Sequence, residues 1–403
     1  MTTTDAALTA TSADEATVDD LVLGLINDFD PRTTDPFEFR GVQFDRGLAW
    51  VGFPEGDGGL GMNPKLQRVV DTKLREAGAR GPSSGRFFGM FLAAPTIVTH
   101  GSPELRKKLL RPLFTGEEVW CQLFSEPGAG SDLASLSTRA VRDGDEWVVN
   151  GQKVWNTLAH LGDRGMLVTR TDPDVPKHRG LTYFALDMHA PGVDVRPLRQ
   201  ITGEAEFNEV FLTDVRIPDT DRLGEVGEGW KVAQTTLMNE RVSIGGGIQP
   251  REFGMIGILA DTWRKRPEVR TPAGQDAVLQ LWVQSEAARL TGIRLVQALA
   301  AGQPGPEGSA SKLVFARLMQ QISGLELELN GEEGLRHDDW TMRRSTAVDF
   351  FGRSPGYRYL RAKGNSIEGG SSEILRNIIA ERVLGLPSEP RIDKDVAWKD
   401  LPR

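Results

Sequence analysis

The stretch WCQLFSEPGAGSDL, residues 120–133, decides the fold that we expect for this chain. Its glycines Gly128 and Gly130 lack a Cβ, so the backbone there can approach a bulky ligand closely. Ser125 and Ser131 place hydroxyl groups beside backbone N–H donors, which suits phosphate oxygens or the acceptor atoms at the edge of a ring. By its spacing alone the stretch is more typical of an ordinary glycine-rich turn. Other parts of the sequence must therefore decide what it does.

Length and composition narrow the class of protein. A chain of 403 residues exceeds the length at which one hydrophobic core usually keeps growing, so several subdomains are expected. Its apolar fraction of 39% and charged fraction of 26% are typical of globular proteins in water. The net charge of −8 and the lack of a basic stripe argue against nucleic-acid binding. The sequence contains neither a signal peptide nor an apolar run of membrane-spanning length, so we expect a cytoplasmic protein.

Cysteine and histidine usage bears on redox and metal chemistry. The single cysteine, Cys121, excludes an intrachain disulfide and fits a reducing compartment. Its apolar neighbours predict a small core residue, and a catalytic thiol is the alternative. The five histidines are scattered, and none has cysteines or carboxylates at metal-ligand spacing. We therefore expect no metal site.

Three blocks of different periodicity follow one another. Residues 1–118 are predicted to form a helical domain that begins with a disordered tail over 1–17. Short alternating or apolar runs separated by Gly and Pro turns over 119–225 predict an antiparallel β-barrel or sandwich. Helical patterns over 226–388 predict a bundle, and 389–403 are expected to form a loosely held tail. The expected class is α+β with several domains.

A second stretch shares the character of the first, and a third stretch is of a different kind. IEGGSSEILR, residues 367–376, is a second glycine- and serine-rich turn that opens a helix, and WKVAQTTLMNER, residues 230–241, carries a carboxylate on a helix. Together with NGQKVW at 150–155 and LRQITGEAEFNEVF at 198–211, they resemble the acyl-CoA dehydrogenase family over about 44–387. Each motif alone is weak evidence, but their common register over this length argues against an accidental match.

The resemblance implies an architecture and a reaction. The architecture is a helical domain, a β-domain and a helical bundle, in the order that the periodicities predict. The reaction is the FAD-dependent α,β-dehydrogenation of an acyl-CoA, in which a carboxylate removes the α-proton and flavin N5 takes the β-hydride. The acyl group would be branched, long or ring-bearing, as in actinobacterial members. An electron-transfer flavoprotein or a similar acceptor, and a homodimer, homotetramer or heteromer, are implied as partners.

Two glutamates compete for the role of base. Many members carry the base in a loop, at a position that falls on Gly369 when aligned backward from Arg376, with Glu368 one place before it. Other members carry it on a helix as Glu-Arg, which matches Glu240 and Arg241. The resemblance thus implies Glu240 as base and Arg241 as the cation beneath it. The Gly369 N–H would donate to the thioester oxygen, and Glu368 is the alternative base. Without the resemblance, Glu240 is a solvated helix residue.

The resemblance also implies where the flavin lies. The implied cofactor contacts are Leu123, Phe124, Ser125, Gly130, Ser131, Trp155, Thr157, Ser371 and Glu373. Thr157 would hydrogen-bond flavin N5, and Trp155 would lie beside the flavin ring. Without the resemblance, Trp155 is a core aromatic residue on a strand, which is compatible with a flavin contact because one face can pack while the other meets the ring. Ser131 and Glu368 are expected at the substrate.

Departures from the family pattern leave other functions open. Arg164 stands where the family usually has a tryptophan near the flavin. The Arg-x-x-Phe-Gly and Gln-x-x-Gly-Gly-x-Gly elements, which hold the adenine across a subunit interface in many members, have no match in register; 251–254 and 349–356 are the nearest stretches. The alternatives are a FAD-poor partner subunit of a heteromeric dehydrogenase, and a flavin oxidase or monooxygenase on the same fold. The presence of Glu240 favours the dehydrogenase.

Overall fold

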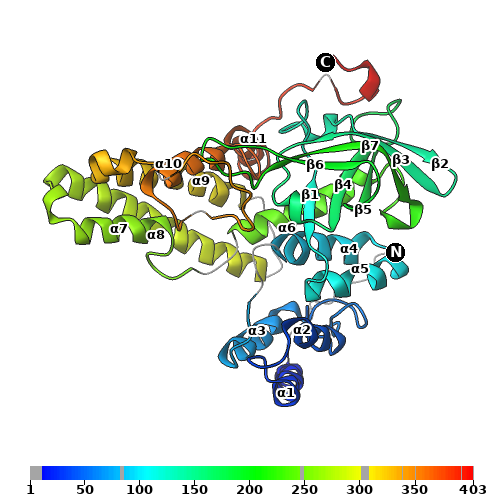
Figure 1. Ribbon diagram of the computed structural model, residues 1–403, viewed down its shortest axis with the longest axis horizontal. Helices are drawn as coiled ribbons and strands as arrows, with labels where there is room; N and C mark the ends of the chain where they lie inside the picture. The colour runs from blue at the N-terminus through cyan, green and yellow to red at the C-terminus, as the bar shows by residue number, and fades with distance from the viewer. Residues whose placement is uncertain are drawn as a thin grey trace.

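The chain folds into a helical N-terminal part, a central β-sheet and a helical C-terminal part (Figure 1). The computed structural model describes residues 11–81, 86–245, 249–300, 308–337, 339–349, 351–391 and 393–402, with only the backbone described for 241–245 and 298–300. The order of these parts is the one that the periodicities predict.

Helices α1 to α5 build the N-terminal part. Their bounds are α1 (Ser12–Asp28), α2 (Pro36–Asp45), α3 (Gln67–Glu76), α4 (Ala94–His100) and α5 (Pro103–Thr115). A capping box begins α1, because the Thr11 hydroxyl accepts from the Asp14 N–H at 3.1 Å and the Asp14 carboxylate accepts from the Thr11 N–H at 3.0 Å. The disordered tail that we expected over 1–17 is therefore too long. Residues 1–10 lie outside the described part of the chain.

Helix α1 is held by its apolar face. Val18, Val22 and Leu25 recur at helical spacing and are fully buried. They share one core cluster with Val70 and Leu74 of α3. The two helices thus pack together in the part of the molecule that lies at the bottom of Figure 1.

The central part is one sheet. Its strands are β1 (Trp120–Leu123), β2 (Arg139–Asp143), β3 (Glu146–Lys153), β4 (Arg164–Arg170), β5 (Leu181–Asp187), β6 (Val193–Pro197), β7 (Asn208–Pro218) and β8 (Arg222–Leu223). The order is β6-β7-β3-β2-β4-β5-β8, with β1 paired to β4 off this path. Two pairs, β1–β4 and β2–β4, are parallel and the others are antiparallel. The predicted β-domain is present, and its pairing is mixed.

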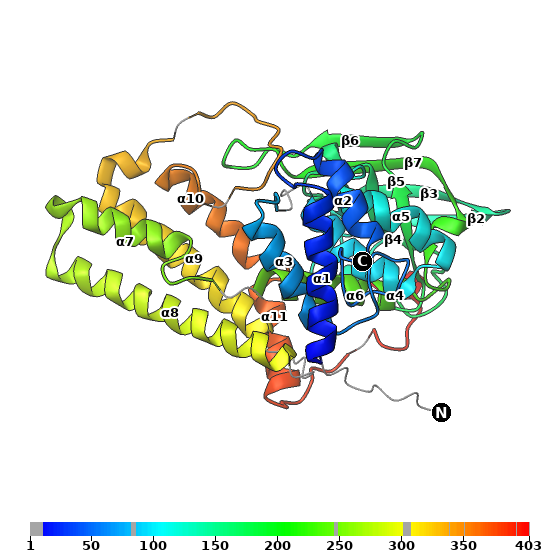
Figure 2. The same cartoon turned by 90° about the horizontal axis from the view of Figure 1, so that it is seen from below.

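Helices α6 to α11 build the C-terminal part. Their bounds are α6 (Gly229–Gly245), α7 (Met255–Lys265), α8 (Pro272–Ala300), α9 (Gly308–Asn330), α10 (Pro355–Ala362) and α11 (Ser372–Ile378). Helices α7 and α8 lie away from the sheet, and α9 runs between them and α10 (Figures 1 and 2). Within the described chain, no helix combines the length and the apolar character that crossing a membrane requires.

Helix α6 joins the three parts. It packs against α4, against β5 and against α9. Its buried Thr236 has the hydroxyls of Thr96 and Tyr183 at 3.0 and 3.1 Å. His100 Nε2 lies 2.8 Å from the Thr235 hydroxyl one residue earlier. These contacts fix the position of α6 at the point where the helical parts and the sheet meet (Figure 1).

The end of the chain returns to the sheet (Figure 1). Trp398 donates from Nε1 to the Ser135 carbonyl at 3.2 Å, and the Arg170 guanidinium lies 4.6 Å from the centre of its ring. Lys177 forms an ion pair with Asp393 at 2.7 Å. The expectation of a loosely held tail over 389–403 is therefore wrong for its last part, which is docked by an aromatic anchor and a half-buried ion pair.

Candidate functional site

Strand β1 delivers the glycine-rich loop. Its last residue, Leu123, and the next, Phe124, bury their side chains in two different core clusters. Any contact of these two residues with a ligand must therefore come from the backbone. Lys153, at the end of β3, is fully buried and donates from Nζ to the Phe124 carbonyl at 3.0 Å and to Glu126 Oε1 at 2.9 Å.

Glu126 fastens the loop from inside. Its carboxylate accepts from the N–H and hydroxyl of Ser137 at 2.7 and 2.9 Å and from the Thr138 N–H at 2.9 Å. Burial alone would raise the pKa of this carboxyl, but the charge of Lys153 and these hydrogen bonds outweigh burial and lower the pKa to about 2. The loop between β1 and β2 is thus held at its base by a buried, ionised pair.

The tip of the loop is open. Gly128 and Gly130 are exposed, and a Cβ added at either would have no described heavy atom within 4 Å. Neither residue has a positive φ. Neither the φ angle nor contacts with the described residues require glycine at these two positions, and the backbone here is open to close approach.

Trp155 stands beside this loop in an unusual conformation. The N–H of the preceding Val154 donates to the Ser125 carbonyl at 2.9 Å, which ties the end of β3 to the loop. Trp155 has φ +62°, and its side chain is 57% exposed. Its ring meets the Phe207 ring edge-on, with the two ring centres 5.8 Å apart. A left-handed conformation costs a residue with a Cβ about 1–2 kcal/mol. Strain and exposure of a large aromatic residue together mark a functional position. Thr157, two residues on, is half-buried.

The two glycine- and serine-rich motifs meet. The Ser131 hydroxyl lies 3.5 Å from the Ser371 hydroxyl, although 240 residues separate them. Ser371 is the N-cap of α11 and accepts from the Ile374 N–H at 3.4 Å. Glu373 points to solvent and pairs with Arg376 at 3.2 Å. The structure therefore brings Ser131 and Ser371 together, whereas Glu373 is engaged at the surface.

The loop before α11 contains the first candidate base. Gly369 and Gly370 have φ +62° and +97°, a region that glycine adopts without strain. Arg361 donates to both carboxylate oxygens of Glu368 at 3.1 and 3.0 Å, and Asn365 Nδ2 donates to Oε1 at 2.6 Å. This carboxylate is therefore held in one orientation by a cation and an amide.

Arg361 also ties this loop to the sheet part of the chain. Its Nε lies 3.5 Å from Oε1 of Glu206, a buried carboxylate that precedes β7. Burial raises the pKa of Glu206, and the charge of Arg361 opposes that rise. The guanidinium lies 5.9 Å from the centre of the Phe207 ring, which contacts Trp155. One arginine thus connects the Glu368 loop to the exposed tryptophan.

The second candidate base lies on α6. Glu240 is half-buried and lies one helical turn beyond Thr236, on the same helix face. Lys312 of α9 is buried, and burial lowers its pKa, while the charges of Glu368 and Glu240 both counteract that shift. The charge of Lys312 is thus influenced by both candidate carboxylates, and its Nζ donates to the Asn365 and Gly370 carbonyls at 2.6 and 2.8 Å. The side chain of Arg241 lies outside the described part of the chain.

Two residues from the sequence analysis have structural tasks. Arg164 begins β4 opposite Trp120 and donates from Nε to Glu118 Oε1 at 3.0 Å. Cys121 is fully buried, and burial raises the pKa of its thiol to about 12, as a core residue requires. The described residues contain no group of side chains suited to hold a metal ion.

Sequence analysis missed Lys153, Arg361 and Lys312. Lys312 had a detectable signal, because it falls at helical spacing among residues of α9 that are buried: Ser309, Ala316, Met319 and Ser323. A lysine at such a position needs acceptors inside the protein. Lys153 and Arg361 had no comparable signal.

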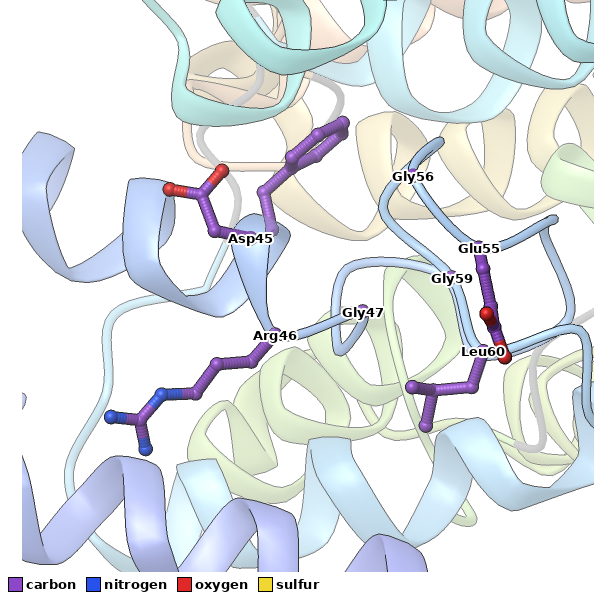
Figure 3. A pocket seen from close by; sticks show the side chains of 8 residues that line it. Asp45, Arg46, Gly47, Glu55, Gly56, Gly59 and Leu60 are labelled. Carbon is purple, nitrogen blue, oxygen red and sulfur yellow. The ribbon is translucent and has the colours of Figure 1, made fainter.

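A separate hollow lies in the N-terminal part (Figure 3). It measures about 340 Å³ and is formed by the end of α2 and the glycine-dense loop after it, including Asp45, Gly47, Glu55 and Leu60. None of the residues expected at the flavin or the substrate lines it.

Comparison with known proteins identifies relatives along the whole chain. Three family models match: the N-terminal domain of acyl-CoA dehydrogenases over 16–117, the middle domain over 121–215 and the C-terminal domain over 227–384. The acyl-CoA dehydrogenase IpdE1 of Mycobacterium tuberculosis is 37% identical over 345 residues, 86% of each protein. The predicted family and architecture are confirmed.

Two further relatives differ in extent and composition. The acyl-CoA dehydrogenase FadE34 of Mycobacterium tuberculosis is 40% identical over 333 residues, which are 82% of this chain but 43% of that protein. The chain thus spans less than half the length of FadE34. The solved structure named Tcur3481-Tcur3483 steroid ACAD is 26% identical with a TM-score of 0.71, and the match covers 95% of this chain and 100% of that one.

Proposed function

Because this chain belongs to the acyl-CoA dehydrogenase family, we propose that it removes two hydrogens from the α,β-bond of an acyl-CoA thioester. The observation that supports this most is the contact between Ser131 and Ser371 at 3.5 Å, beside a loop that Lys312 of α9 bonds and next to α6, the helix of Glu240. A thioester α-proton is weakly acidic, so the reaction needs a positioned carboxylate and donors at the carbonyl oxygen. These groups meet where the sheet and the C-terminal helices join.

The residues around the glycine-rich loop fit a flavin. Gly128 and Gly130 leave open space for a large ligand, Ser131 offers a hydroxyl, and the exposed ring of Trp155 offers an aromatic face. Members of this family are generally FAD-dependent, and FAD when bound supplies the acceptor for the β-hydride. We propose that Ser125, Ser131, Trp155, Thr157 and Ser371 hold it, with Leu123, Phe124 and Gly130 contributing backbone.

Glu240 is the base that we propose. Both oxygens of Glu368 accept from Arg361, and Oε1 also accepts from Asn365, so moving this carboxylate toward a substrate would break three hydrogen bonds. Glu240 comes instead from α6, a helix that Thr236 fixes against the other two parts of the chain. We assign Glu368 a structural task and assign the Gly369 N–H, on a backbone in the left-handed region, as donor to the thioester oxygen.

The experiment that tests this function uses anaerobic mixing of the purified holoenzyme with a panel of straight-chain, branched and ring-bearing acyl-CoAs. We expect the flavin absorbance to bleach with one class of thioester. Glu240→Gln should slow bleaching by roughly 10²–10⁴-fold, the range that a general base contributes, with FAD still bound. Glu368→Gln should slow it by less than about tenfold. A flavin that no thioester bleaches would refute the proposal and favour an oxidase or monooxygenase.

A heteromeric assembly is the second candidate. The stretch 251–254 is engaged locally: Glu252 accepts from Arg264 at 2.8 and 2.9 Å and from Trp282 Nε1 at 2.9 Å, and Arg251 pairs with Glu286 at 3.1 Å. These bonds give the segment a task other than holding adenine. The related Tcur3481-Tcur3483 steroid ACAD is named as a pair of components. We propose that a partner subunit completes the adenine end and that the acyl group is ring-bearing.

Native mass and flavin content test this assembly. A heteromer predicts that the chain purified alone holds less than one FAD per chain, and that co-expression with its partner restores full occupancy. A homo-oligomer with one FAD per chain and full activity would contradict it. Electrons would then pass to an electron-transfer flavoprotein or a similar acceptor in either case.

A further inference from the structure

Lys312 is an unusual residue for the buried face of a helix. It lies in α9 with only 6% of its surface exposed, and lysine is almost never this buried unless its charge is satisfied. Burial lowers the pKa of its ammonium group, which opposes keeping it charged. A leucine or methionine would pack at this position without that opposition. The chain therefore places a charge here for a reason other than packing.

The ammonium group of Lys312 binds both ends of one loop. Nζ donates to the Asn365 carbonyl at 2.6 Å and to the Gly370 carbonyl at 2.8 Å. Gly369 lies between these two anchors, at φ +62°, and Gly370 itself is at φ +97°. Two consecutive residues in the left-handed region form a sharp bend, which glycine adopts without strain. Lys312 thus closes this bend as a two-point clamp.

The charges of two carboxylates act on the same ammonium group. Glu368 comes from the clamped loop and Glu240 from α6, and both attract the Lys312 charge. Arg361 neutralises Glu368 directly through two hydrogen bonds. Glu240 is on α6, which packs against α9, and Lys312 of α9 is hydrogen-bonded to the loop that contains Gly369.

We infer that Lys312 is a positioning residue for the proposed dehydrogenation: its ammonium group fixes the 365–370 loop, and with it the Gly369 N–H, relative to Glu240. This inference rests on the proposed function. Proton removal at the α-carbon and hydrogen bonding at the thioester oxygen must act together on one substrate. Because Lys312 bonds the loop and attracts the Glu240 carboxylate, it couples the two groups geometrically without touching the reacting atoms.

The first test measures how well the backbone of the 365–370 loop is held in place, and it does not depend on catalytic activity. Hydrogen exchange of amides in 365–370 should be at least tenfold faster in Lys312→Met than in the parent holoenzyme, because methionine fills the same space without donating to the two carbonyls. Lys363→Met is the matched control, since this exposed lysine lies just before the loop and has its Nζ 3.8 Å from the centre of the Tyr359 ring. Its exchange should equal that of the parent. Unchanged exchange in folded Lys312→Met would overturn the inference.

The second test measures catalysis. Lys312→Met should lower the kcat of acyl-CoA-dependent dye reduction roughly 100-fold with KM within about threefold, because the coupled geometry matters most in the transition state. Lys312→Arg keeps the charge and the donors and should recover kcat to within about tenfold of the parent. If Lys312→Met does not fold, the kcat of Lys312→Arg is compared directly with that of the parent, and a loss of more than tenfold would overturn the positioning role. Faster exchange with an unchanged kcat would overturn the positioning role. A parent enzyme that no thioester reduces would refute the proposed function instead, and the exchange result would still decide the clamp.

Discussion

The buried pair of Lys153 and Glu126 provides a sharp test of how the glycine-rich loop is held. Lys153→Met removes the ammonium group and nearly preserves the volume of the side chain. The variant leaves the Glu126 carboxylate buried with only the Ser137 and Thr138 donors. It also leaves the Phe124 carbonyl without the Nζ donor at 3.0 Å.

Two independent arguments give the size of the effect. The pKa of Glu126 falls from an ordinary 4.5 to about 2, and one unit corresponds to about 1.4 kcal/mol, so the interactions stabilise the ionised carboxylate by about 3 kcal/mol. Burial lowers the pKa of Lys153 although the charge of Glu126 opposes that shift, so this figure describes the carboxylate and not the pair as a whole. Removing one partner of a buried ion pair typically costs about 3–5 kcal/mol because the other charge stays buried. We therefore expect Lys153→Met to lower the free energy of unfolding by about 3–5 kcal/mol.

Urea unfolding of the holoenzyme at pH 7, followed by far-UV circular dichroism, measures this loss. The double variant Glu126→Gln/Lys153→Met should be more stable than Lys153→Met alone, because it buries no unpaired charge. Lys399→Met is the matched control: it breaks an exposed ion pair with Asp174 at 2.6 Å and should leave the urea midpoint unchanged. A Lys153→Met midpoint equal to that of the parent would refute the reasoning.

The same pair has a defined pH dependence. The folded state depresses the pKa of Glu126, so its contribution is fully present above the unfolded pKa of about 4.5 and is lost as the pH falls toward 2. The difference in stability between the parent and Lys153→Met should therefore shrink as the pH is lowered from about 5 to about 3. If the free energies of unfolding of the parent and of Lys153→Met change in parallel over that pH range, Lys153 does not stabilise the ionised Glu126 carboxylate.

Three other predictions address single residues. Trp155→Gly should leave the Tm of the flavin-free protein unchanged or raise it, because glycine adopts φ +62° without strain, and the flavin retained by the holoprotein on gel filtration should fall; a lower Tm of the flavin-free protein with all flavin retained by the holoprotein would contradict the assignment. Cys121 should resist iodoacetamide in the native protein at pH 8 and react only after unfolding, since burial raises its pKa to about 12, and mass spectrometry would detect any native labelling. Trp398→Ala should lower Tm by a few degrees through loss of about 1–2 kcal/mol of contacts with Arg170 and Ser135, and calorimetry measures it.

Local patterns in the sequence determined the order of the parts and the position of the motifs. The period of the apolar residues changes from helical to alternating and back, because a helix and a strand expose their faces at different spacings. For the same reason the burial of Val18, Val22 and Leu25 follows from spacing alone. Three motifs can be recognised from a few neighbouring residues each: the glycine-rich loop, the 367–376 turn and the helix of Glu240.

Only the tertiary structure decided what these motifs do to one another. The chain path brings Ser131 to Ser371 across 240 residues, directs Arg361 to Glu368, and buries Lys312 against the carbonyls of Asn365 and Gly370. It also docks the end of the chain on the sheet, where composition predicted a loose tail. The periodicity of apolar residues predicts which face of an element is buried, but it does not predict which distant element packs on that face. The choice between two carboxylates depends on such long-range neighbours, and therefore on the fold.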